Sequence, residues 1–547
     1  MKKALLVLSI LFLSLFSFSQ LNTAAIDSIF SDWDNPNSPG CSIGIFEKGQ
    51  IIYSKGYGNA NLEYSIPNSS TSVFRIGSTS KQFTAACIVL LEQQGKLKFD
   101  NVLTDYFPEF PDYAKKITVR QLLNHTSGLR DYLTLSYLKG LGDDDFYTDE
   151  DVMRWMINQH DLNFEPGEEF VYCNSGYWLL GQIVNEITGI SMAEYADQEI
   201  FTPLGMNNTH FHDDHTEIVP NRASGYDLED ENDYYISMTT LDMIGDGGIF
   251  TTIEDVKLWD DAFYKSSVLD KAFWNEMTRT GKLNSDEAIE YASGLFVGEY
   301  NGLKMISHGG AFVGFRADVV RFPDQEVTIA VFANRADANP SARAIQVADI
   351  ILSEYFTLEN SSEINVVASE EEAIKPTSFA GDYQIQPGMS LTISIAKKNL
   401  HVLQSWDESE YDIERSAGNT YMLPGRENLS FRFTNLEDDF TQILEVNQNG
   451  SITACKRKVF FDDSEINYNE YVGVYYSDEL EVEYSIVMGD EGLELSINQL
   501  ESENITPDSI DRFYGDGGVI KFLRDKSTIS GFKLDAGRVK NLHFRKK

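Results

Sequence analysis

The sequence is organised around residues 77–86, which read Gly-Ser-Thr-Ser-Lys-Gln-Phe-Thr-Ala-Ala. The apolar run over residues 85–91 predicts a buried helix, so Ser78 should lie at a helix N-terminus with Lys81 one turn further on. Side chains three positions apart share a helix face, and the helix N-terminus favours an oxyanion. The stretch therefore fits a serine nucleophile for acyl transfer. Ser-x-x-Lys alone is equally compatible with an N-cap serine and a surface lysine.

The composition limits the possible classes of protein. At ~150 residues per domain, a chain of 547 residues predicts about two to four domains. Its aromatic content of 12% favours substantial β structure. The net charge of −41 argues against nucleic acid and anionic membranes as partners, because such a surface repels them. The four cysteines do not resemble a disulfide framework, and we expect Cys41 and Cys87, which lie in apolar runs, to be buried thiols.

Residues 1–19 have the pattern of a secretory signal peptide. Lys2 and Lys3 precede an apolar run, and small residues follow it in the position required for cleavage before Gln20. The run is short for a membrane span, and no later stretch could cross a bilayer. We therefore expect an exported protein, periplasmic or secreted, without an integral membrane anchor.

The order of helix and strand signals predicts an α+β unit over residues 20–356. A hairpin is expected over residues 41–55, helices over 78–207, strands from 291 onwards and a last helix over 341–356. Residues 40–44 also read Gly-Cys-Ser-Ile-Gly, which matches the nucleophile-elbow pattern. That motif requires a helix after the serine, whereas a hairpin is expected here, so Ser42 is not favoured as the nucleophile.

An acidic linker over residues 357–376 is expected to end this unit. Beyond it, short strand signals alternate with turns, and the sequence contains an internal repeat in which Phe-Ala-Gly-Asp-Tyr at 379–383 resembles Tyr-Val-Gly-Val-Tyr at 471–475. Two small antiparallel β-barrels of the lipocalin type, over residues 377–460 and 468–547, fit this pattern best.

Three separate motifs occur in the order expected for one enzyme superfamily. They are Ser78-x-x-Lys81, Tyr172-Cys173-Asn174 and His308-Gly309-Gly310. Together with residues 74–77, 122–129, 203–206 and 247–248, they resemble the serine β-lactamase and penicillin-binding-protein superfamily. The similarity is to the branch of class C β-lactamases, D-alanyl-D-alanine carboxypeptidases, D-aminopeptidases and related esterases, and it covers residues 25–356. It implies an antiparallel sheet flanked by helices, with a helical subdomain.

The resemblance also implies roles for individual residues. Ser78 would be the acylated nucleophile, Lys81 its activating partner and Tyr172 the proton shuttle, since nearby cations favour the tyrosinate that accepts the Ser78 proton. Asn174, His308 and Gly310 would bind substrate. The backbone N–H groups of Ser78 and Ala311 would form the oxyanion hole. No metal or other cofactor is expected.

One departure from the lactamase pattern bears on the substrate. His308 stands where the family usually has the lysine of a Lys-Thr-Gly strand. Because histidine offers a cation only when protonated, efficient β-lactam hydrolysis is in doubt. We expect a protonated His308 to pair with a substrate carboxylate, which would give kcat/KM an alkaline limb belonging to this residue.

A second motif suggests different chemistry. Residues 210–215 read His-Phe-His-Asp-Asp-His, which matches the zinc text of metallo-β-lactamases. That fold needs a preceding buried strand and further histidines downstream, and neither is evident here. We therefore interpret the segment as a solvated loop, and expect neither loss of activity with a chelator nor rescue by zinc.

The sequence leaves several functions open. The leading hypothesis is a metal-independent serine hydrolase that cleaves amide or ester bonds of small peptides, peptidoglycan fragments or β-lactams. A D-aminopeptidase-like exopeptidase and a non-catalytic penicillin- or peptide-binding sensor are the alternatives. We also expect the second barrel to reach the active site through a loop at residues 511–518, where Asp511 or Asp516 could meet a substrate amine.

Overall fold

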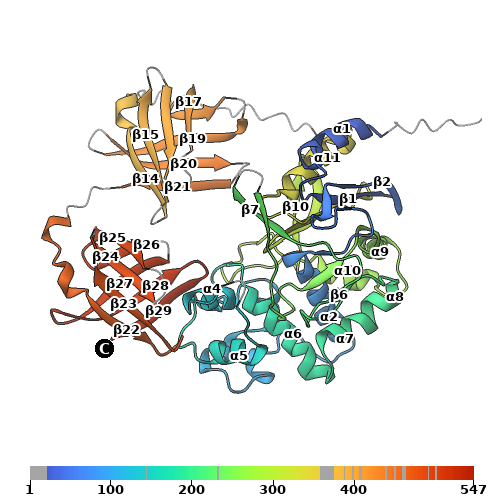
Figure 1. The fold of residues 1–547 in the computed structure, drawn as a ribbon, viewed down its shortest axis with the longest axis horizontal. Coiled ribbons are helices and arrows are strands. Elements are labelled where there is room, and N and C mark those ends of the chain that lie inside the picture. Colours follow the sequence, from blue (N-terminus) through green and yellow to red (C-terminus); the bar gives the residue numbers. More distant parts are fainter. Residues whose placement is uncertain are drawn as a thin grey trace, which may run out of the picture.

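A computed structural model describes residues 21–357, apart from 143–144 and 231–232, and residues 375–547, apart from gaps at 387–388, 397–398, 406–408, 425, 438–439, 449–450, 459–462, 491, 499–501 and 516. The expected signal peptide and most of the expected linker lie outside these residues. Figure 1 shows a mixed helix and sheet unit, drawn blue to yellow, with two barrels beside it in orange and red. This α+β architecture with two C-terminal barrels confirms the predicted fold class.

A six-stranded antiparallel sheet forms the centre of the first unit, in the order β10-β11-β12-β13-β1-β2. Because β1 pairs with β13, the first hairpin of the chain lies beside the last strand of the unit. The strands are β1 (Cys41–Glu47), β2 (Gln50–Tyr57), β10 (Phe296–Tyr300), β11 (Leu303–Phe312), β12 (Phe315–Phe322) and β13 (Val327–Ala333).

Both faces of this sheet are covered, which explains why β13 is buried at every position and apolar apart from Thr328. Alternate residues of a strand point to opposite faces. Ile329 and Val331 pack with α1 (Thr23–Ile29) and α11 (Pro340–Leu352) on one face, while Ala330 and Phe332 join the large core on the other. The sheet is thus a rigid support on which the loops of the unit are placed.

The larger hydrophobic core lies among the helices that cover the other face of the sheet. Gln82 of α2 accepts a hydrogen bond from the Trp259 indole of α9 at 2.7 Å, which ties these two buried helices together. The helices are α2 (Lys81–Gln93), α3 (Val119–Leu123), α4 (Tyr132–Leu138), α5 (Asp149–Ile157), α6 (Asn174–Thr188), α7 (Met192–Ala196), α8 (Thr202–Leu204), α9 (Ile253–Tyr264) and α10 (Lys271–Met277). Three small sheets complete the unit: β3 (Asn59–Asn61) with β4 (Ile66–Pro67), β5 (Phe74–Arg75) with β9 (Ile249–Thr251) and β6 (His210–Phe211), and β7 (Tyr226–Asp230) with β8 (Asp233–Ile236).

The internal repeat corresponds to two closed antiparallel barrels of eight strands each. The first contains β14 (Gly381–Gln386), β15 (Met389–Ala396), β16 (Asn399–Gln404), β17 (Glu410–Ala417), β18 (Thr420–Leu423), β19 (Arg426–Glu437), β20 (Phe440–Gln448) and β21 (Ser451–Arg457). The second contains β22 (Gly473–Ser477), β23 (Val482–Met488), β24 (Leu493–Ile497), β25 (Glu503–Ser509), β26 (Arg512–Gly515), β27 (Gly518–Asp525), β28 (Thr528–Ala536) and β29 (Val539–Lys546). Closure removes the exposed strand edges that short sheets otherwise present.

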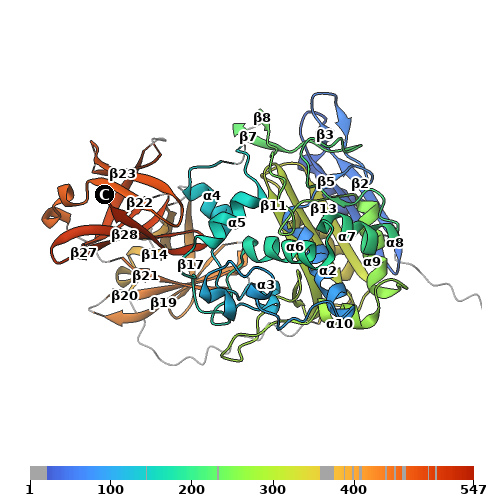
Figure 2. The same ribbon diagram turned by 90° about the horizontal axis from the view of Figure 1, so that it is seen from below.

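The second barrel docks on the helical layer next to α4 and α5 (Figures 1 and 2). Arg130 and Glu479 form a buried ion pair across this contact, and Glu479 also accepts a hydrogen bond from the His160 N–H at 2.8 Å. The Tyr484 hydroxyl donates to the Leu138 carbonyl at 2.8 Å. A buried charge without its partner is strongly destabilising, so this contact fixes the position of the barrel.

Two further expectations concern cysteines and membrane spans. Cys41, Cys87, Cys173 and Cys455 are all buried and unpaired, as expected for Cys41 and Cys87. Among the described residues, the helices are too short or too polar to span a bilayer.

Candidate active site

Ser78 lies in η2 (Gly77–Ser80), a short 3₁₀ helix that leads directly into α2, where Lys81 is the first residue. Gly77 has φ +50°, which favours glycine, and a side chain there would come within 2.8 Å of the Ala311 nitrogen. The missing side chain therefore lets β11 lie directly against η2. Ser78 and Lys81 share one side of the turn, as predicted.

The Lys81 ammonium has three acceptors for its three hydrogens. It donates to Ser78 Oγ at 3.2 Å, to Asn174 Oδ1 at 2.9 Å and to the Asp246 carbonyl at 2.6 Å. Lys81 is completely buried, so each bond is shielded from water and the ammonium position is fixed. Asn174 is the first residue of α6, and its Oδ1 accepts the bond from Lys81.

The Tyr172 ring lies between two cations. Lys81 Nζ is 4.7 Å from the ring centroid, and the Arg538 guanidinium carbon is 5.0 Å from it. The Tyr172 hydroxyl is buried but has no hydrogen-bond partner in the described part of the chain. An orphaned buried hydroxyl costs about 1–3 kcal/mol, and such groups are often found where a substrate or a proton transfer supplies the partner.

The His125 ring packs against the Tyr172 ring. Their ring centroids are 4.2 Å apart, and His125 Nδ1 accepts a hydrogen bond from the Cys173 N–H at 3.1 Å. Burial holds the pKa of His125 well below its usual value, with the neighbouring Lys81 charge acting in the same direction. His125 is therefore a neutral platform. His125 belongs to the sequence motif at residues 122–129, but nothing in that motif predicted its contact with Tyr172.

β11 forms the wall opposite Tyr172. A side chain at Gly310 would come within 1.9 Å of the Ile76 carbonyl, so only glycine permits this close approach of β11 to the strand before Ser78. Ala311 follows, and both it and Ser78 line the same cavity. The two residues expected to supply oxyanion-hole N–H groups are thus brought together.

His308 lies in the cavity wall, but not as expected. It is 2% exposed, its Nε2 contacts the Tyr291 hydroxyl at 2.9 Å, and its Nδ1 contacts the Gly309 carbonyl at 2.6 Å. A neutral ring satisfies both, since Nδ1–H donates to the carbonyl while Nε2 accepts from tyrosine. Burial, together with the Lys81 charge, lowers the pKa of His308 to about 3. The expectation of a protonated His308 is therefore wrong: a buried ring beside a fixed ammonium is neutral at pH 7.

These groups open onto a cavity of about 580 Å³. Its lining includes three arginines, Arg75, Arg316 and Arg538, and Asp246. Arg75 is buried, and its Nε has no partner among the described residues. Burial raises the pKa of Asp246 to about 6, although the Lys81 charge opposes this shift. The cavity is therefore rich in positive charge at neutral pH.

Arg538 comes from the turn between β28 and β29 of the second barrel. Its carbonyl accepts a hydrogen bond from Asn163 Nδ2 at 2.9 Å, and its guanidinium lies 3.6 Å from the Asp131 carboxylate. Asp131 also accepts the Asn174 N–H at 2.6 Å, which links the turn to α6. Because Arg130 holds the barrel and Asp131 contacts its turn, two consecutive residues connect the barrel to the cavity.

The expected loop at 511–518 does not play this part. Asp511 accepts hydrogen bonds from Arg524 Nε at 2.7 Å and from the Tyr471 hydroxyl at 2.9 Å, inside its own barrel, and Asp516 lies outside the described residues. The second barrel reaches the cavity through residue 538 instead. Nothing in the local sequence around Arg538 predicted this, because its position depends on how the barrel docks.

The remaining sequence candidates lie elsewhere. Ser42 is on β1 and donates to the Ser69 carbonyl at 2.7 Å, in agreement with its rejection as a nucleophile. The segment 210–215 is not a solvated loop throughout: His210 is part of β6, and His212 is 3% exposed. The metallo-β-lactamase arrangement is also absent from these residues, because His215 pairs with Asp242 at 2.9 Å rather than with the other two histidines.

Comparison with known proteins agrees with this geometry. The family model described as Beta-lactamase matches residues 26–351, which is more than half of the chain. Penicillin-binding protein 4* of Bacillus subtilis (strain 168) is 27% identical over 372 residues, covering 65% of this chain and 82% of that protein. A D-aminopeptidase of Brucella anthropi is 27% identical over 301 residues, covering 54% of this chain and only 56% of the relative.

A solved structure extends the similarity of fold. The octameric penicillin-binding protein homologue from Pyrococcus abyssi aligns with 88% of this chain and 99% of its own, at a TM-score of 0.55 and 22% identity. At this identity the comparison concerns the fold alone. The family match, the relatives and the fold together show a hydrolytic enzyme related to penicillin-binding proteins and D-aminopeptidases. The chain belongs to the Beta-lactamase family.

Proposed function

We propose that this protein is an exported serine hydrolase, with a catalytic domain over residues 20–356, that forms an acyl-enzyme on Ser78. Its substrates are small peptides, peptidoglycan fragments or β-lactams with an amide or ester bond. The observation that carries the proposal is the Tyr172 hydroxyl, which is buried and unpartnered among the described residues, on a ring whose centroid is 4.7 Å from the Lys81 ammonium that binds Ser78. A binding protein has no need of such a costly group.

The proposed reaction has two halves. In the first, Tyr172 acts as a phenolate after giving its hydroxyl proton to solvent; Ser78 Oγ attacks the carbonyl carbon while its proton passes to the Tyr172 phenolate oxygen, and Lys81 stabilises the negative charge that moves between them. The Ser78 and Ala311 N–H groups stabilise the tetrahedral oxyanion. The bond to the leaving group then breaks, and the leaving group takes the proton from Tyr172. In the second half, water attacks the ester by the same route and restores Ser78.

The charges in the cavity favour a substrate that carries a carboxylate. Arg75 has an unpartnered Nε, and the 45% exposed side chain of Arg538 reaches the cavity from the barrel. Within a partly closed cavity, attraction between opposite charges is stronger than in bulk water. D-Ala-D-Ala peptides and β-lactams carry the required carboxylate. With His308 neutral, the arginines take over the anion-binding role first assigned to it.

An aminopeptidase is the second candidate, favoured by the D-aminopeptidase relatives and by Asp246. A carboxyl group with a pKa of about 6 is ionised at pH 7 and could receive a substrate ammonium. The test is a panel of matched substrates on the purified protein: D-amino-acid amides, D-Ala-D-Ala peptides, nitrocefin and p-nitrophenyl esters. A clear preference for amine substrates would overturn the carboxylate proposal. If none of the substrates were turned over, the result would favour the alternative of a non-catalytic sensor.

Replacing Arg538 by alanine should weaken binding of carboxylate substrates. We expect KM to rise about fivefold for a substrate with a free carboxylate and to stay within about twofold for its methyl ester, since a partly exposed ion pair contributes about 1 kcal/mol. The value of kcat should change less than KM. Steady-state kinetics with both substrates checks this.

The matched control for this change is Lys540→Ala. Lys540 lies two residues further along in the same barrel, where its ammonium contacts Glu169 at 3.3 Å. It should leave both KM values unchanged. Equal effects of Arg538→Ala on the acid and its ester would show that the turn acts only as a structural support.

The pH dependence should lack a contribution from His308. Because its pKa is lowered to about 3, His308 is neutral across the working range. As the pH rises through about 6.5, where a normal histidine loses its charge, the ratio of kcat/KM for carboxylate and neutral substrates should therefore stay constant. A loss of activity near this pH for the carboxylate substrate alone would support the original hypothesis that a protonated His308 binds the substrate carboxylate. Protein stability should instead fall as the pH drops from about 6.5 towards 3, because only the unfolded state takes up the proton readily.

A further inference from the structure

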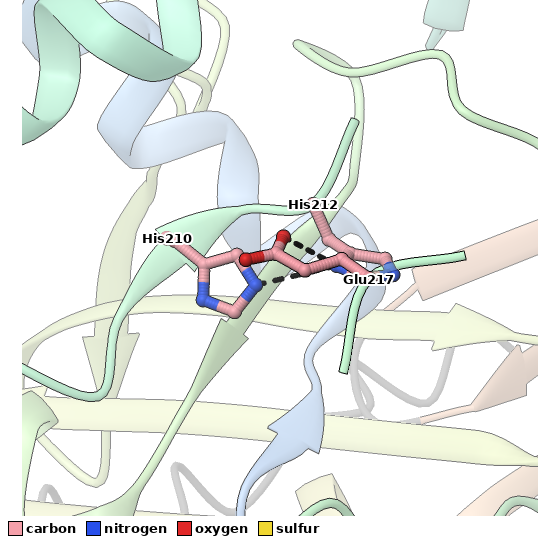
Figure 3. Close-up of side chains that lie close together, drawn as sticks. All are labelled: His210, His212 and Glu217. Carbon is pink, nitrogen blue, oxygen red and sulfur yellow. Dashed lines mark hydrogen bonds and ion pairs between the residues drawn. The ribbon is translucent and has the colours of Figure 1, made fainter. Parts of the chain in front are cut away.

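A cluster of two histidines and one glutamate lies outside the cavity, beside the small sheet formed by β5, β9 and β6. His210, His212 and Glu217 point toward one another (Figure 3), and one ligand-type atom from each lies within 4.8 Å of the others. We propose that this cluster is a structural binding site for Zn²⁺ or a similar divalent transition-metal ion. The proposal is independent of the function assigned to Ser78.

The sequence builds the cluster from one short segment. His210 lies in β6 and His212 directly after it, and residues two apart in extended chain share a side. Asp214 then turns the chain back: its carbonyl accepts the Glu217 N–H at 3.0 Å, and its carboxylate accepts the Thr216 N–H at 2.9 Å. The turn places Glu217 opposite the two rings.

The distances fit one bound ion. His210 Nε2 and His212 Nδ1 are 3.3 Å apart. Two nitrogens bound to one tetrahedral zinc at about 2.0–2.1 Å lie about 3.3–3.4 Å from each other. Glu217 Oε2 is 3.8 Å from His212 Nδ1, slightly more than ligation requires, and the Glu217 side chain is 56% exposed and able to move closer. A water would complete the usual four ligands.

The chemistry of the three side chains selects the class of ion. Neutral imidazole suits zinc and its neighbours, whereas Ca²⁺ and Mg²⁺ require oxygen ligands. A mere hydrogen-bonded histidine pair is the competing explanation, and it has no need of Glu217.

The position of the cluster indicates what the ion would do. β6 pairs with β9, which pairs with β5, and β5 leads through Ile76 into the Ser78 turn. The His212 N–H donates to the Gly248 carbonyl at 2.8 Å, and Gly248 lines the cavity. A bound ion would therefore fasten the segment 212–217 to the sheet that supports the Ser78 turn, without touching the substrate.

The test uses the full-length protein, stripped with a chelator and dialysed. Titration with Zn²⁺ should give one site per chain by calorimetry and elemental analysis, Co²⁺ should give the visible spectrum of a four-coordinate site, and added Zn²⁺ should raise Tm. Ca²⁺ and Mg²⁺ should do none of these. Absence of zinc binding by the wild-type protein would overturn the proposal.

Variants then locate the ion. His210→Ala and His212→Ala should each weaken zinc binding at least about 100-fold. Losing a residue that only hydrogen-bonds to a metal ligand already lowers metal affinity by about 10–100-fold, and these two residues are ligands themselves. Glu217→Gln, at an exposed position where folding is not at risk, should weaken it about tenfold or more. His215→Ala is the matched control from the same segment and should bind zinc as the wild type does. If Glu217→Gln and His210→Ala each bound zinc with the affinity of the wild type, the zinc would lie elsewhere and the proposed site would be rejected.

Discussion

Replacing Ser78 by alanine is expected to lower kcat by about 10⁶-fold, the size of the loss measured when a serine nucleophile is removed. Ser78 Oγ is the hydroxyl that the buried Lys81 ammonium contacts, at 3.2 Å, and it faces the cavity. Covalent labelling by a fluorescent penicillin or a phosphonate should also disappear. Intact-mass spectrometry of the labelled protein measures this, and a remaining adduct on Ser78→Ala would refute the assignment of the nucleophile.

Ser42→Ala is the matched control, because Ser42 lies on β1 with its hydroxyl bound to the Ser69 carbonyl. It should leave turnover and labelling intact. Ser80 is a less suitable control. Its Oγ accepts the Ile249 N–H at 3.1 Å in the core, so Ser80→Ala should lower the free energy of unfolding by about 1–3 kcal/mol while the nucleophile remains.

Much of the fold could be predicted because its signals are local. The two-residue period and apolar runs at 41–55 and 303–334 correspond to β1, β2, β11, β12 and β13. Thr252 followed three residues later by Asp255 is typical of a helix start, and the Thr252 side chain accepts the Asp255 N–H at the start of α9. The repeat after residue 376 predicted two barrels, because each copy repeats the same short strands. Such patterns depend only on residues close in sequence.

The site could be predicted only as far as its motifs extended. Ser78, Lys81, Tyr172 and Asn174 were identified from spacing and resemblance, and the structure brings them together around one ammonium. The charge of His308 could not be read from the motif, because it depends on burial and on Tyr291, which lies on a different segment. Long-range contacts decide protonation, and a single sequence does not show them.

Two other features were missed for related reasons. Arg538 is 366 residues from Tyr172 in the chain, and only docking of the second barrel through Arg130 and Glu479 brings them together. In the segment 210–217, the zinc motif of metallo-β-lactamases, which the sequence matches, includes His215. The structure instead turns His215 towards Asp242 and brings Glu217 to His210 and His212. A motif fixes which residues are present, but the turn at Asp214 decides which of them meet.

Replacing Tyr172 by phenylalanine should lower kcat by about 10²–10⁴-fold, the range for a general acid–base group. The ring would keep its contacts with His125, Lys81 and Arg538, because only the hydroxyl is removed. That hydroxyl has no partner among the described residues, so the variant should be at least as stable as the wild type. Steady-state kinetics and thermal unfolding, measured on the same sample, check both expectations.

Tyr177→Phe is the matched control for this change. Tyr177 belongs to the same aromatic cluster, with Lys81 5.6 Å from its ring, but its hydroxyl donates to the Leu123 carbonyl at 2.8 Å. Its loss should therefore lower stability by about 1 kcal/mol and leave kcat nearly unchanged. The two variants should thus show opposite patterns, with Tyr172→Phe stable and slow and Tyr177→Phe less stable and active. If Tyr172→Phe kept its kcat, the proton of Ser78 would have to pass directly to Lys81, and the orphaned hydroxyl would have no catalytic explanation.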